Sequence, residues 1–391
     1  MVDPINFDEV KKQFFAKMKQ KAEEVKEPCV LRAADVQPRE HDWLWDGHLL
    51  CAAVEMMTGL PSIGKSQVHC SFVACVTTTK PWPDGTDSGE PANVVMLTAE
   101  DALDQELIPR LMAAGADLKR VHILKCIKSD GNDRQFLLDS DLDMLEKVVT
   151  EIGDVKLITI DPITSYQGVK IDSHKTTAVR SQLGPLKDFA ERNHVAVSCI
   201  THPAKAAGNK AIDWFIGSQA YIAAARVGHV CIPEMETDDN GDKIETGRVL
   251  FCHVKHNASE RMPTLAFRKK SFDLHGTSCD PFTIIQSVRV EWGEDSVDIS
   301  ADEAIREAAS SGNVNRLTGK QAEVVAFLRQ MLQGGEPVAK RDIDAEAAKR
   351  GYSHEQLKTA RNNLKKGGDD IVAAQVPGQA HAGWTWQWLR F

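Results

Sequence analysis

The feature that most constrains the fold of this chain is a glycine-rich turn between an apolar run and a helical pattern. Residues 59–66 read Gly-Leu-Pro-Ser-Ile-Gly-Lys-Ser, which fits GxxxxGK[ST]. CAAVEMM precedes the turn and QVHCSFVACVTT follows it, so the turn joins a buried strand to a helix. Glycines let such a turn wrap around phosphates, and its N–H groups and the helix N-terminus supply positive potential.

We therefore expect a nucleoside triphosphate at this turn. Lys65 is expected to reach the phosphate oxygens and Ser66 to hold Mg²⁺. The residues expected to form the nucleotide site are Gly59, Pro61, Ser62, Ile63, Gly64, Lys65, Ser66 and Gln67.

Carboxylates follow two other apolar runs, at the strand ends where open α/β sheets bind ligands. The run 155–161 ends in Asp161, which we expect to organise Mg²⁺ with Ser66. The run 94–97 leads to Glu100 and Asp101, and we expect Glu100 to align a water with the γ-phosphorus. The alternative is that both acids cap the helix that follows, since helix N-termini favour acids.

A third apolar run, Val195–Ile200, ends in Thr201-His202. His202 either contacts the γ-phosphate, and so reports its presence to the loop beyond, or is an ordinary loop histidine.

Apolar runs alternate with helical patterns from Trp43 to about Val290, which is typical of a largely parallel sheet. Asn240-Gly241 between two such runs predicts a long hairpin, so the sheet should end in antiparallel strands. The strand candidates are Leu49–Met57, Val94–Leu97, Val121–Leu124, Leu157–Ile160, Val195–Ile200, Val227–Ile232 and Val249–Val254.

Four segments are expected along the chain. Residues 1–42 form an N-terminal helical segment, whose amphipathic stretch Asn6–Lys26 packs on its own domain or on a neighbouring subunit. Residues 43–293 form an α/β ATPase domain, and residues 294–316 are polar and read as a linker with one short helical patch. Residues 317–391 form a separate small α+β domain.

The C-terminal segment predicts three helices, over residues 318–332, 340–350 and 353–366, followed by a hairpin. Ser353 with Gln356 three residues later should cap the third helix. Three helices and a β wing are typical of a winged helix, which docks on duplex or forked DNA or on a protein. Alternating tryptophans on the last strand, Trp384, Trp386 and Trp388, more plausibly close this domain's core than stack on bases.

Charge and cysteine content exclude several classes of protein. The net charge of −9 argues against a chain that coats nucleic acid, although residues 317–391 carry 11 Lys and Arg against 8 Asp and Glu. The nine cysteines contain no CxxC pair and read as reduced core residues. No two Cys or His pairs have zinc-ligand spacing, so a zinc site is not expected. No apolar run is long enough to span a membrane and no signal peptide is evident, so we expect a cytoplasmic protein.

Taken together, Gly59–Ser66, Glu100-Asp101, Asp161 and Thr201-His202 resemble the RecA-type ATPases, and within them the hexameric helicases of the plasmid and phage RepA type. The resemblance spans roughly residues 43–268 and extends to two tryptophan motifs, Trp43-Leu44-Trp45 and Pro81-Trp82-Pro83. It implies a RecA-like P-loop core that assembles as a homo-oligomeric ring, a hexamer, with ATP between subunits.

The resemblance also implies that a positively charged residue of the neighbouring subunit, the finger, is inserted into the ATP site. The stretch 217–226 matches the family's segment ending in that arginine, so Arg226 is the expected finger. Its alternative is a surface or structural ion pair. Lys255 occupies the family's lysine turn and is a second candidate, but Asn257 stands where related helicases carry arginine, which shifts the weight to Arg226.

Translocation in such a ring requires basic loops after the Asp161 and His202 strands. The loop from Ser165 to Arg180 and the loop from Ala204 to Lys210 both qualify, although exposed basic residues are often merely solvated. The expected nucleic-acid contacts are Lys170, Lys175, Arg180, Lys205 and Lys210 in these loops and Lys358, Arg361 and Lys365 on the third helix of the C-terminal domain.

The sequence thus predicts a Mg²⁺- and ATP-dependent helicase or translocase that acts on single-stranded DNA in replication of a phage, plasmid or mobile element. The C-terminal domain is expected to bind duplex DNA or a replication protein. The alternative is a RecA-like ATP-driven switch that binds DNA or a partner through its C-terminal domain without unwinding. A recombinase filament is a weaker third option, because neither long DNA-binding loops nor a polymerisation strand is evident.

Overall fold

The computed structural model describes residues 30–129, 132–168, 176–203, 210–215, 220–238, 243–276, 283–310, 319–332, 337–366, 370–375 and 384–389. The chain divides into two compact units, residues 1–41 and 42–391. The first unit has one described element, a short 3₁₀ helix over Ala33–Asp35. The amphipathic helix expected over residues 6–26 lies outside the described residues.

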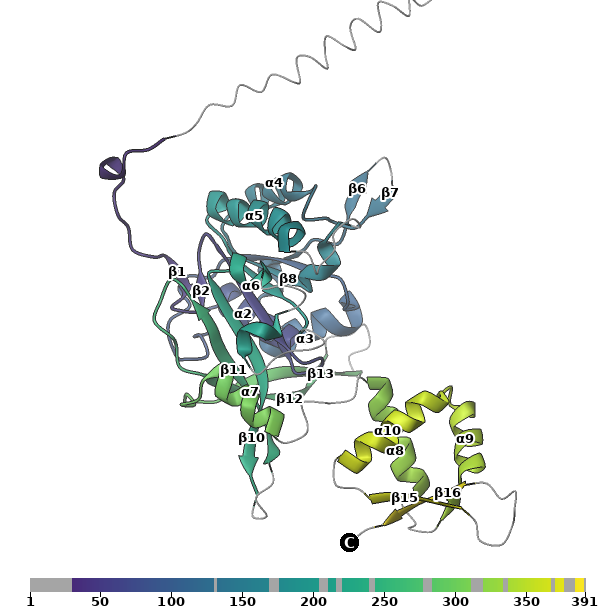
Figure 1. Cartoon of the computed structure of the whole chain (residues 1–391). Helices are drawn as coiled ribbons and strands as arrows, with labels where there is room; N and C mark the ends of the chain where they lie inside the picture. The colour runs from purple at the N-terminus through teal and green to yellow at the C-terminus, as the bar shows by residue number, and fades with distance from the viewer. Residues whose placement is uncertain are drawn as a thin grey trace, which may run out of the picture. The chain divides into compact units, whose positions relative to one another are not determined.

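A nine-stranded mixed sheet forms the centre of the larger unit, in the order β13-β12-β11-β10-β3-β9-β8-β4-β5 (Figure 1). Neighbouring strands among β10, β3, β9, β8, β4 and β5 pair in parallel. Neighbouring strands among β10, β11, β12 and β13 pair antiparallel. The predicted α/β class and mostly parallel sheet are therefore confirmed. In chain order the strands are β3 Ala53–Gly59, β4 Asn93–Thr98, β5 Val121–Ile123, β8 Val155–Asp161, β9 Ala196–Ile200, β10 Val227–Thr237, β11 Lys243–His256, β12 Leu265–His275 and β13 Ile284–Trp292.

The first strand candidate, Leu49–Met57, is divided in the structure. Leu49–Leu50 is a separate short strand, β2, which pairs with β1 over Trp43–Trp45. Ala52 has φ of 59°, a left-handed conformation that no extended strand contains, so the chain turns there before β3 begins. The ring of Trp45 stacks on that of Trp82 with centroids 5.1 Å apart, which joins the two tryptophan motifs in one core.

Helices cover both faces of the sheet (Figure 1). The cluster around α2 packs on one face, and the cluster around α4 and α5 packs on the other. Almost every side chain of α2 is buried, so its apolar side chains do not gather on one face, and the buried polar ones, such as His69 and Ser71, form hydrogen bonds. The helices are α2 Lys65–Thr77, α3 Ile108–Ala114, α4 Leu142–Ile152, α5 Thr176–Asn193, α6 Ala220–Ala224 and α7 Ala301–Ser310.

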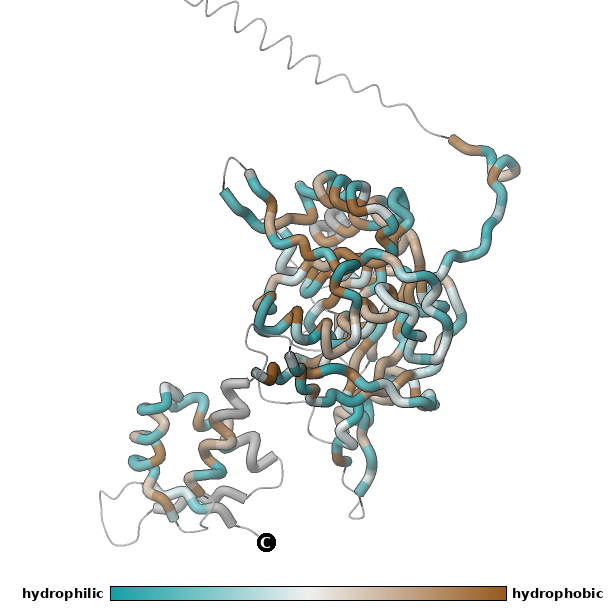
Figure 2. The backbone as a smooth tube through the Cα atoms, turned by 180° about the vertical axis from the view of Figure 1, so that it is seen from behind, coloured by the Kyte–Doolittle hydropathy of each residue, from teal (hydrophilic) through white to brown (hydrophobic). Residues whose placement is uncertain are grey.

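Shorter elements fill the connections. A two-stranded hairpin of β6 Ile127–Ser129 and β7 Asn132–Arg134 stands on its own and is mostly hydrophilic, whereas hydrophobic stretches gather in the middle of the domain (Figure 2). A π-helical turn covers Leu103–Leu107, and 3₁₀ helices cover Leu118–Arg120, Ile163–Tyr166 and Ala211–Trp214.

Helix α7 lies inside the segment 294–316 that the sequence suggested as a linker. It buries Ala304 and Ile305 against β10 and β11 in a third core cluster. Residues 301–310 are therefore a packed element of the sheet domain and not a linker. Residues 311–316 lie outside the described residues.

The described residues between 319 and 389, called the C-terminal domain below, form three helices and a three-stranded antiparallel sheet in the order β14-β16-β15. They belong to the same compact unit, residues 42–391, as the nine-stranded sheet, so the expected separation of this segment as a domain stays a prediction. The three predicted helices and the predicted hairpin are present. Ser353 N donates to Gln356 Oε1 over 2.7 Å, and Gln356 N donates to Ser353 Oγ over 3.3 Å, so the expected helix cap is confirmed. The elements are α8 Gly319–Leu332, β14 Val338–Ala339, α9 Lys340–Lys349, α10 His354–Lys366, β15 Asp370–Gln375 and β16 Trp384–Leu389.

Trp386 closes the core of this small domain, as predicted, and packs with Phe327, Leu328 and Leu357. The guanidinium of Arg361 lies 5.0 Å from the Trp386 ring centroid, a cation–π contact. The side chains of Trp384 and Trp388 lie outside the described part of the chain.

Of the seven cysteines whose surroundings are described, all are unpaired and six are buried, which agrees with the reduced core residues expected. No helix among the described residues is long and apolar enough to cross a lipid bilayer.

Candidate nucleotide-binding site

The glycine-rich turn connects β3 to α2 and depends on two glycines. Gly59 has φ of 155°, and a Cβ there would lie 2.6 Å from the Cys231 carbonyl oxygen. Gly64 has φ of 117° and immediately precedes α2. Side chains other than hydrogen are strained at both positions, so the turn keeps its path only with glycine.

Lys65 is buried at the start of α2 and folds back over the turn. Its Nζ donates to the carbonyl oxygens of Gly59 and Leu60 over 2.8 and 3.0 Å. Burial lowers the pKa of Lys65, while the nearby acids Asp161 and Glu100 act in the opposite direction. Phosphate oxygens entering the turn would replace these two carbonyls as acceptors of the ammonium group.

A cavity of about 530 Å³ opens beside this turn and gathers most of the predicted site. Ile63 instead buries its side chain in the core, and Gly59 contributes a carbonyl to Lys65. The residues that line the cavity are Pro61, Ser62, Gly64, Lys65, Ser66, Gln67, Glu100, Asp101, Arg110, Asp161, Ile200, His202, Lys269, Ser271 and Val288.

Asp161 ends β8 and meets Ser66 in the cavity, as the sequence predicted. Burial raises the pKa of Asp161 to about 6, and a hydrogen bond from the Ser66 hydroxyl and the charge of Lys65 limit the rise. A carboxylate and a hydroxyl side by side are hard oxygen ligands, and a divalent cation would offset the cost of burying the charge. The residues present therefore fit Mg²⁺.

Glu100 and Asp101 follow β4 but have different surroundings. Asp101 forms an ion pair with Arg110 at 2.5 Å, and both side chains are largely buried. Neither acid caps the following helical segment, which begins after Ala102 with no side-chain hydrogen bond at its cap. Glu100 is 60% exposed, and its Oε1 lies 3.6 Å from His202 Nε2. Both acids line the cavity, and Glu100 is the more exposed of the two and the one that is not paired with an arginine.

Lys269 and Arg110 belong to the site although the sequence did not suggest either. Lys269 on β12 donates from Nζ to the Ser62 carbonyl oxygen over 2.5 Å. It reaches the turn because β12 and β13 pair at the antiparallel end of the sheet, and neither strand was expected. The segment LAFRKKSFDL carries charges on its exposed positions, which dilute the apolar pattern of a strand.

Arg226 and Lys255 lie at the other end of the strands. Cys231 on β10 is level with Gly59, and Arg226 precedes it by five residues, about 16 Å at ~3.3 Å per residue. Arg226 is exposed, and Lys255 Nζ donates to the carbonyl oxygens of Ile222 and Ala223 over 2.8 and 2.9 Å. Neither residue lines the cavity of its own chain, so the structure does not join Lys255 to the nucleotide site within one subunit.

The expected DNA-binding residues of the sheet domain are described only in part. Lys170, Lys175 and Lys205 lie outside the described residues. Arg180 belongs to α5, which begins at Thr176, so its expected place in a loop is wrong. The stretch 176–180 reads TTAVR, in which Thr and Val are weak helix formers, so its helical state was not apparent.

Lys210 is exposed just before the 3₁₀ helix Ala211–Trp214. On α10, Lys358 is exposed, Arg361 is partly covered by its contact with Trp386, and the Lys365 side chain lies outside the described set.

A buried polar chain crosses the sheet on its α2 side. Ser198 Oγ donates to Glu55 Oε2 over 2.5 Å, and Glu55 Oε1 lies 2.8 Å from His229 Nδ1. His69 on α2 reaches Ser198 at 2.9 Å, and His229 reaches His48 at 3.0 Å. These hydrogen bonds link β3, β9, β10 and α2, the elements that carry the phosphate turn and its neighbours.

The geometry of the turn, the two acids and His202 is that of a P-loop nucleotide site. Residues 20–208 match the family model of the AAA domain. The match supports an ATPase, and it contains the phosphate turn, Glu100, Asp161 and His202. Arg226, Lys255 and the C-terminal domain lie beyond the matched residues. A search of the curated proteins finds no match to the chain.

Proposed function

We propose that this protein is a ring-forming, ATP-dependent motor that translocates on single-stranded DNA and unwinds duplexes in the replication of a phage, plasmid or mobile element. One observation carries the proposal. The AAA domain has its phosphate turn and acids at one end of the strands, whereas Arg226 is exposed at the other end. An arginine in that position serves an ATPase best when it completes the site of a neighbouring subunit.

In this proposal the chain's own residues bind ATP and align water. The turn N–H groups and Lys65 hold the phosphates, and Ser66 and Asp161 hold Mg²⁺, which neutralises charge on the phosphate oxygens when it is bound. Glu100 accepts a hydrogen bond and then a proton from the attacking water. His202, 3.6 Å from Glu100, is placed to respond to the γ-phosphate and to transmit its loss to the loop that follows β9.

Assembly as a homohexamer would add an arginine from the neighbouring subunit to the cationic side chains that already line the cavity. Charge spreads over the γ-phosphate oxygens in the transition state, and Arg226 of an adjacent subunit would stabilise it there. Burial lowers the pKa of Lys255, and the charge of the neighbouring Arg226 lowers it further. Its ammonium is held by two carbonyls of α6. With its ammonium engaged in this way, Lys255 is better suited to position Arg226 than to act as a second finger.

The C-terminal domain is proposed to be a winged helix that binds duplex DNA or a replication protein. The order of its elements, helix, strand, two helices and a hairpin, supports this assignment. On α10 the exposed Lys358 is the better DNA contact, because Arg361 is engaged with Trp386.

The competing function is a nucleotide-driven switch in which the AAA domain opens or assembles with ATP and the C-terminal domain recruits DNA or a partner. It uses the same nucleotide site and needs neither translocation nor Arg226 in trans. Dependence of hydrolysis on single-stranded DNA separates the two functions.

The test is steady-state ATP hydrolysis with and without a long single-stranded oligonucleotide, together with the mass in solution with Mg²⁺ and a non-hydrolysable ATP analogue. Lys65→Ala is the control that removes site-dependent hydrolysis. A hexameric mass with strong stimulation by the single strand supports the motor. A monomer or dimer whose hydrolysis ignores DNA rejects the motor in favour of the switch.

A further inference from the structure

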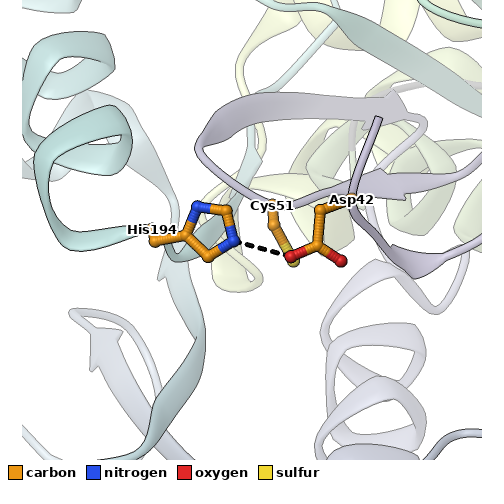
Figure 3. A group of neighbouring side chains, drawn as sticks. All are labelled: Asp42, Cys51 and His194. Carbon is orange, nitrogen blue, oxygen red and sulfur yellow. Dashed lines mark hydrogen bonds and ion pairs between the residues drawn. The ribbon is translucent and has the colours of Figure 1, made fainter. Parts of the chain in front are cut away.

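Three metal-ligating side chains from distant parts of the chain meet beside the amino ends of β3 and β9 (Figure 3). They are Asp42, Cys51 and His194, and their ligand atoms all lie within 4.8 Å of one another. This place is at the opposite end of the strands from the phosphate turn, so the cluster belongs to no part of the nucleotide site.

The backbone holds these three residues together. Cys51 N donates to the Asp42 carbonyl oxygen over 2.9 Å, and this bond holds together the two segments that flank the β1–β2 hairpin. Ala53 is level with Ala196 in the parallel pair of β3 and β9, and this register brings His194 alongside Cys51. His194 Nε2 lies 2.6 Å from Asp42 Oδ2, the contact drawn in Figure 3.

The donor set selects a borderline transition-metal ion over a hard cation. A thiolate, an imidazole and a carboxylate are the ligand types of Zn²⁺, whereas Ca²⁺ and Mg²⁺ prefer oxygens alone. Tetrahedral bonds of about 2.0–2.1 Å separate nitrogen and oxygen ligands by about 3.3 Å. The Asp42–His194 pair would therefore open by less than 1 Å to admit the ion, from the 2.6 Å observed.

Exposure of the cluster is uneven in a way that suits an open metal site. Cys51 is 8% exposed, whereas the side chains of Asp42 and His194 are 63% and 57% exposed. The sulfur thus forms the floor, and the carboxylate and imidazole face solvent, where water can take a fourth position. Burial and the charge of Asp42 raise the pKa of Cys51 to about 11, and the charge of Lys156 acts in the opposite direction. The thiol therefore carries its proton without the ion, and a metal ion that binds here releases that proton.

We propose that Asp42, Cys51 and His194 bind one Zn²⁺ ion with water as the fourth ligand. The ion ties the segment entering β1 to the β2–β3 turn and to the turn between α5 and β9. Spacing in the sequence did not predict this site, because Asp42 and His194 are 152 residues apart and no two of the ligands form a short motif. The alternative is a simple Asp–His ion pair above a buried thiol.

The test uses the full, tag-free chain, stripped of metal with a chelator and titrated with Co²⁺ as a spectroscopic substitute for Zn²⁺. The expected result is a sulfur-to-cobalt charge-transfer band that saturates at one equivalent, is accompanied by the intense visible bands of a four-coordinate ion, and disappears when Zn²⁺ is added. The magnesium site contains no thiol, so Co²⁺ bound there gives no such band and the two sites are distinguishable.

Variants assign the ligands. Cys51→Ser should abolish the charge-transfer band, and Cys126→Ser, a matched change at a half-buried cysteine outside the cluster, should leave it intact. His194→Asn and Asp42→Asn should each weaken Co²⁺ binding at least tenfold, and asparagine tolerates the left-handed φ of 52° at position 194. Zn²⁺ should raise the unfolding temperature of the wild-type chain and not that of Cys51→Ser.

Absence of a thiolate band in the wild-type chain overturns the proposal in favour of the ion pair. A band that survives in Cys51→Ser overturns it as well, because another cysteine then holds the ion. Loss of the band in a Cys51→Ser chain that keeps its unfolding transition and ATP binding supports the assignment, because the fold is then intact.

Discussion

At the scale of single residues, the buried hydrogen-bond network from His69 through Ser198, Glu55 and His229 to His48 has one consistent direction of donation. Burial raises the pKa of Glu55 to about 8 and lowers the pKa values of His69 and His229 to about 3, so all three are neutral at pH 7. The Glu55 carboxyl then donates to His229 Nδ1 and accepts from Ser198, and His229 donates to His48. His69 Nδ1 at one end of the network has no partner, but the continuous run of bonds from His69 Nε2 to His48 fixes the relative positions of the strands that it joins.

This network predicts a pH dependence of stability. The pKa of Glu55 is higher in the fold than in the unfolded chain, so its contribution is fully present below pH ~4.5 and is lost as pH rises through 8. The buried histidines affect the free energy of unfolding only below pH ~6.5, where their protonation in the unfolded chain begins to favour unfolding. Between pH 6.5 and 8.5 the wild-type chain should lose about 2 kcal/mol of unfolding free energy.

Glu55→Gln should flatten that loss, because the amide donates to His229 and accepts from Ser198 without ionising. Urea unfolding at three pH values between 6.5 and 8.5 measures the effect. An equal slope in the wild-type and Glu55→Gln chains would show that Glu55 is ionised throughout.

Lys269 offers a second prediction at this scale. Its ammonium lies against the phosphate turn, so Lys269→Met should weaken ATP binding by roughly 5- to 30-fold, about 1–2 kcal/mol, through loss of a charge near the phosphates. Lys270→Met is the matched control, because Lys270 pairs with Glu291 outside the cavity. Fluorescent-nucleotide titration measures both, and equal affinities would exclude Lys269 from the site.

At the scale of elements, the sequence was informative where a local pattern matched a local cause. The Ser353–Gln356 cap, the glycine-rich turn and the strand ending in Asp161 each follow from a few adjacent residues, and each is present. Strands β12 and β13 were not predicted, because half-exposed antiparallel strands carry charges that interrupt the apolar pattern.

Elements of the site that depend on distant pairing were also beyond prediction. Lys269 reaches the phosphate turn only through the assembled sheet, because it lies 207 residues from Ser62. Arg110 is only nine residues from Asp101, but the π-helical turn and helix α3 that bring the two together were not apparent in the sequence. The role of α7 was missed for a related reason. Its buried residues are three alanines and one isoleucine, so its apolar face is small and reads as a patch in a polar segment.

Helix α7 gives the prediction for this scale. Ile305 is 1% exposed in the cluster with β10 and β11, so Ile305→Ala should lower the unfolding free energy of the sheet domain by about 2–4 kcal/mol. Arg306→Ala, at the exposed neighbouring position, should change it by less than about 0.5 kcal/mol. Thermal unfolding of the full chain compares the two, and similar effects would mean that α7 does not belong to this core.

At the scale of the whole molecule, the separation of Arg226 from the cavity makes hydrolysis a property of the assembly. Lys65→Ala chains lack a working site, and Arg226→Ala chains lack the residue that completes a neighbour's site, so each should be inactive alone. A mixture of the two should regain activity, because roughly a quarter of the interfaces in a mixed ring pair an intact site with an intact arginine. Lack of recovery in a mixture that forms mixed rings would place Arg226 outside catalysis in trans.

The measurement that tests the central claim most directly is ATP binding and hydrolysis by Glu100→Gln. The glutamine keeps the size of Glu100 and cannot accept a proton, so we predict wild-type ATP affinity with hydrolysis reduced roughly 10²-fold or more, with or without single-stranded DNA. Asp101→Asn, which alters the acid paired with Arg110, serves as the neighbouring comparison and should retain more activity. Hydrolysis at the wild-type rate in Glu100→Gln would contradict the account, because the exposed acid that is not paired with Arg110 would then have no part in the reaction.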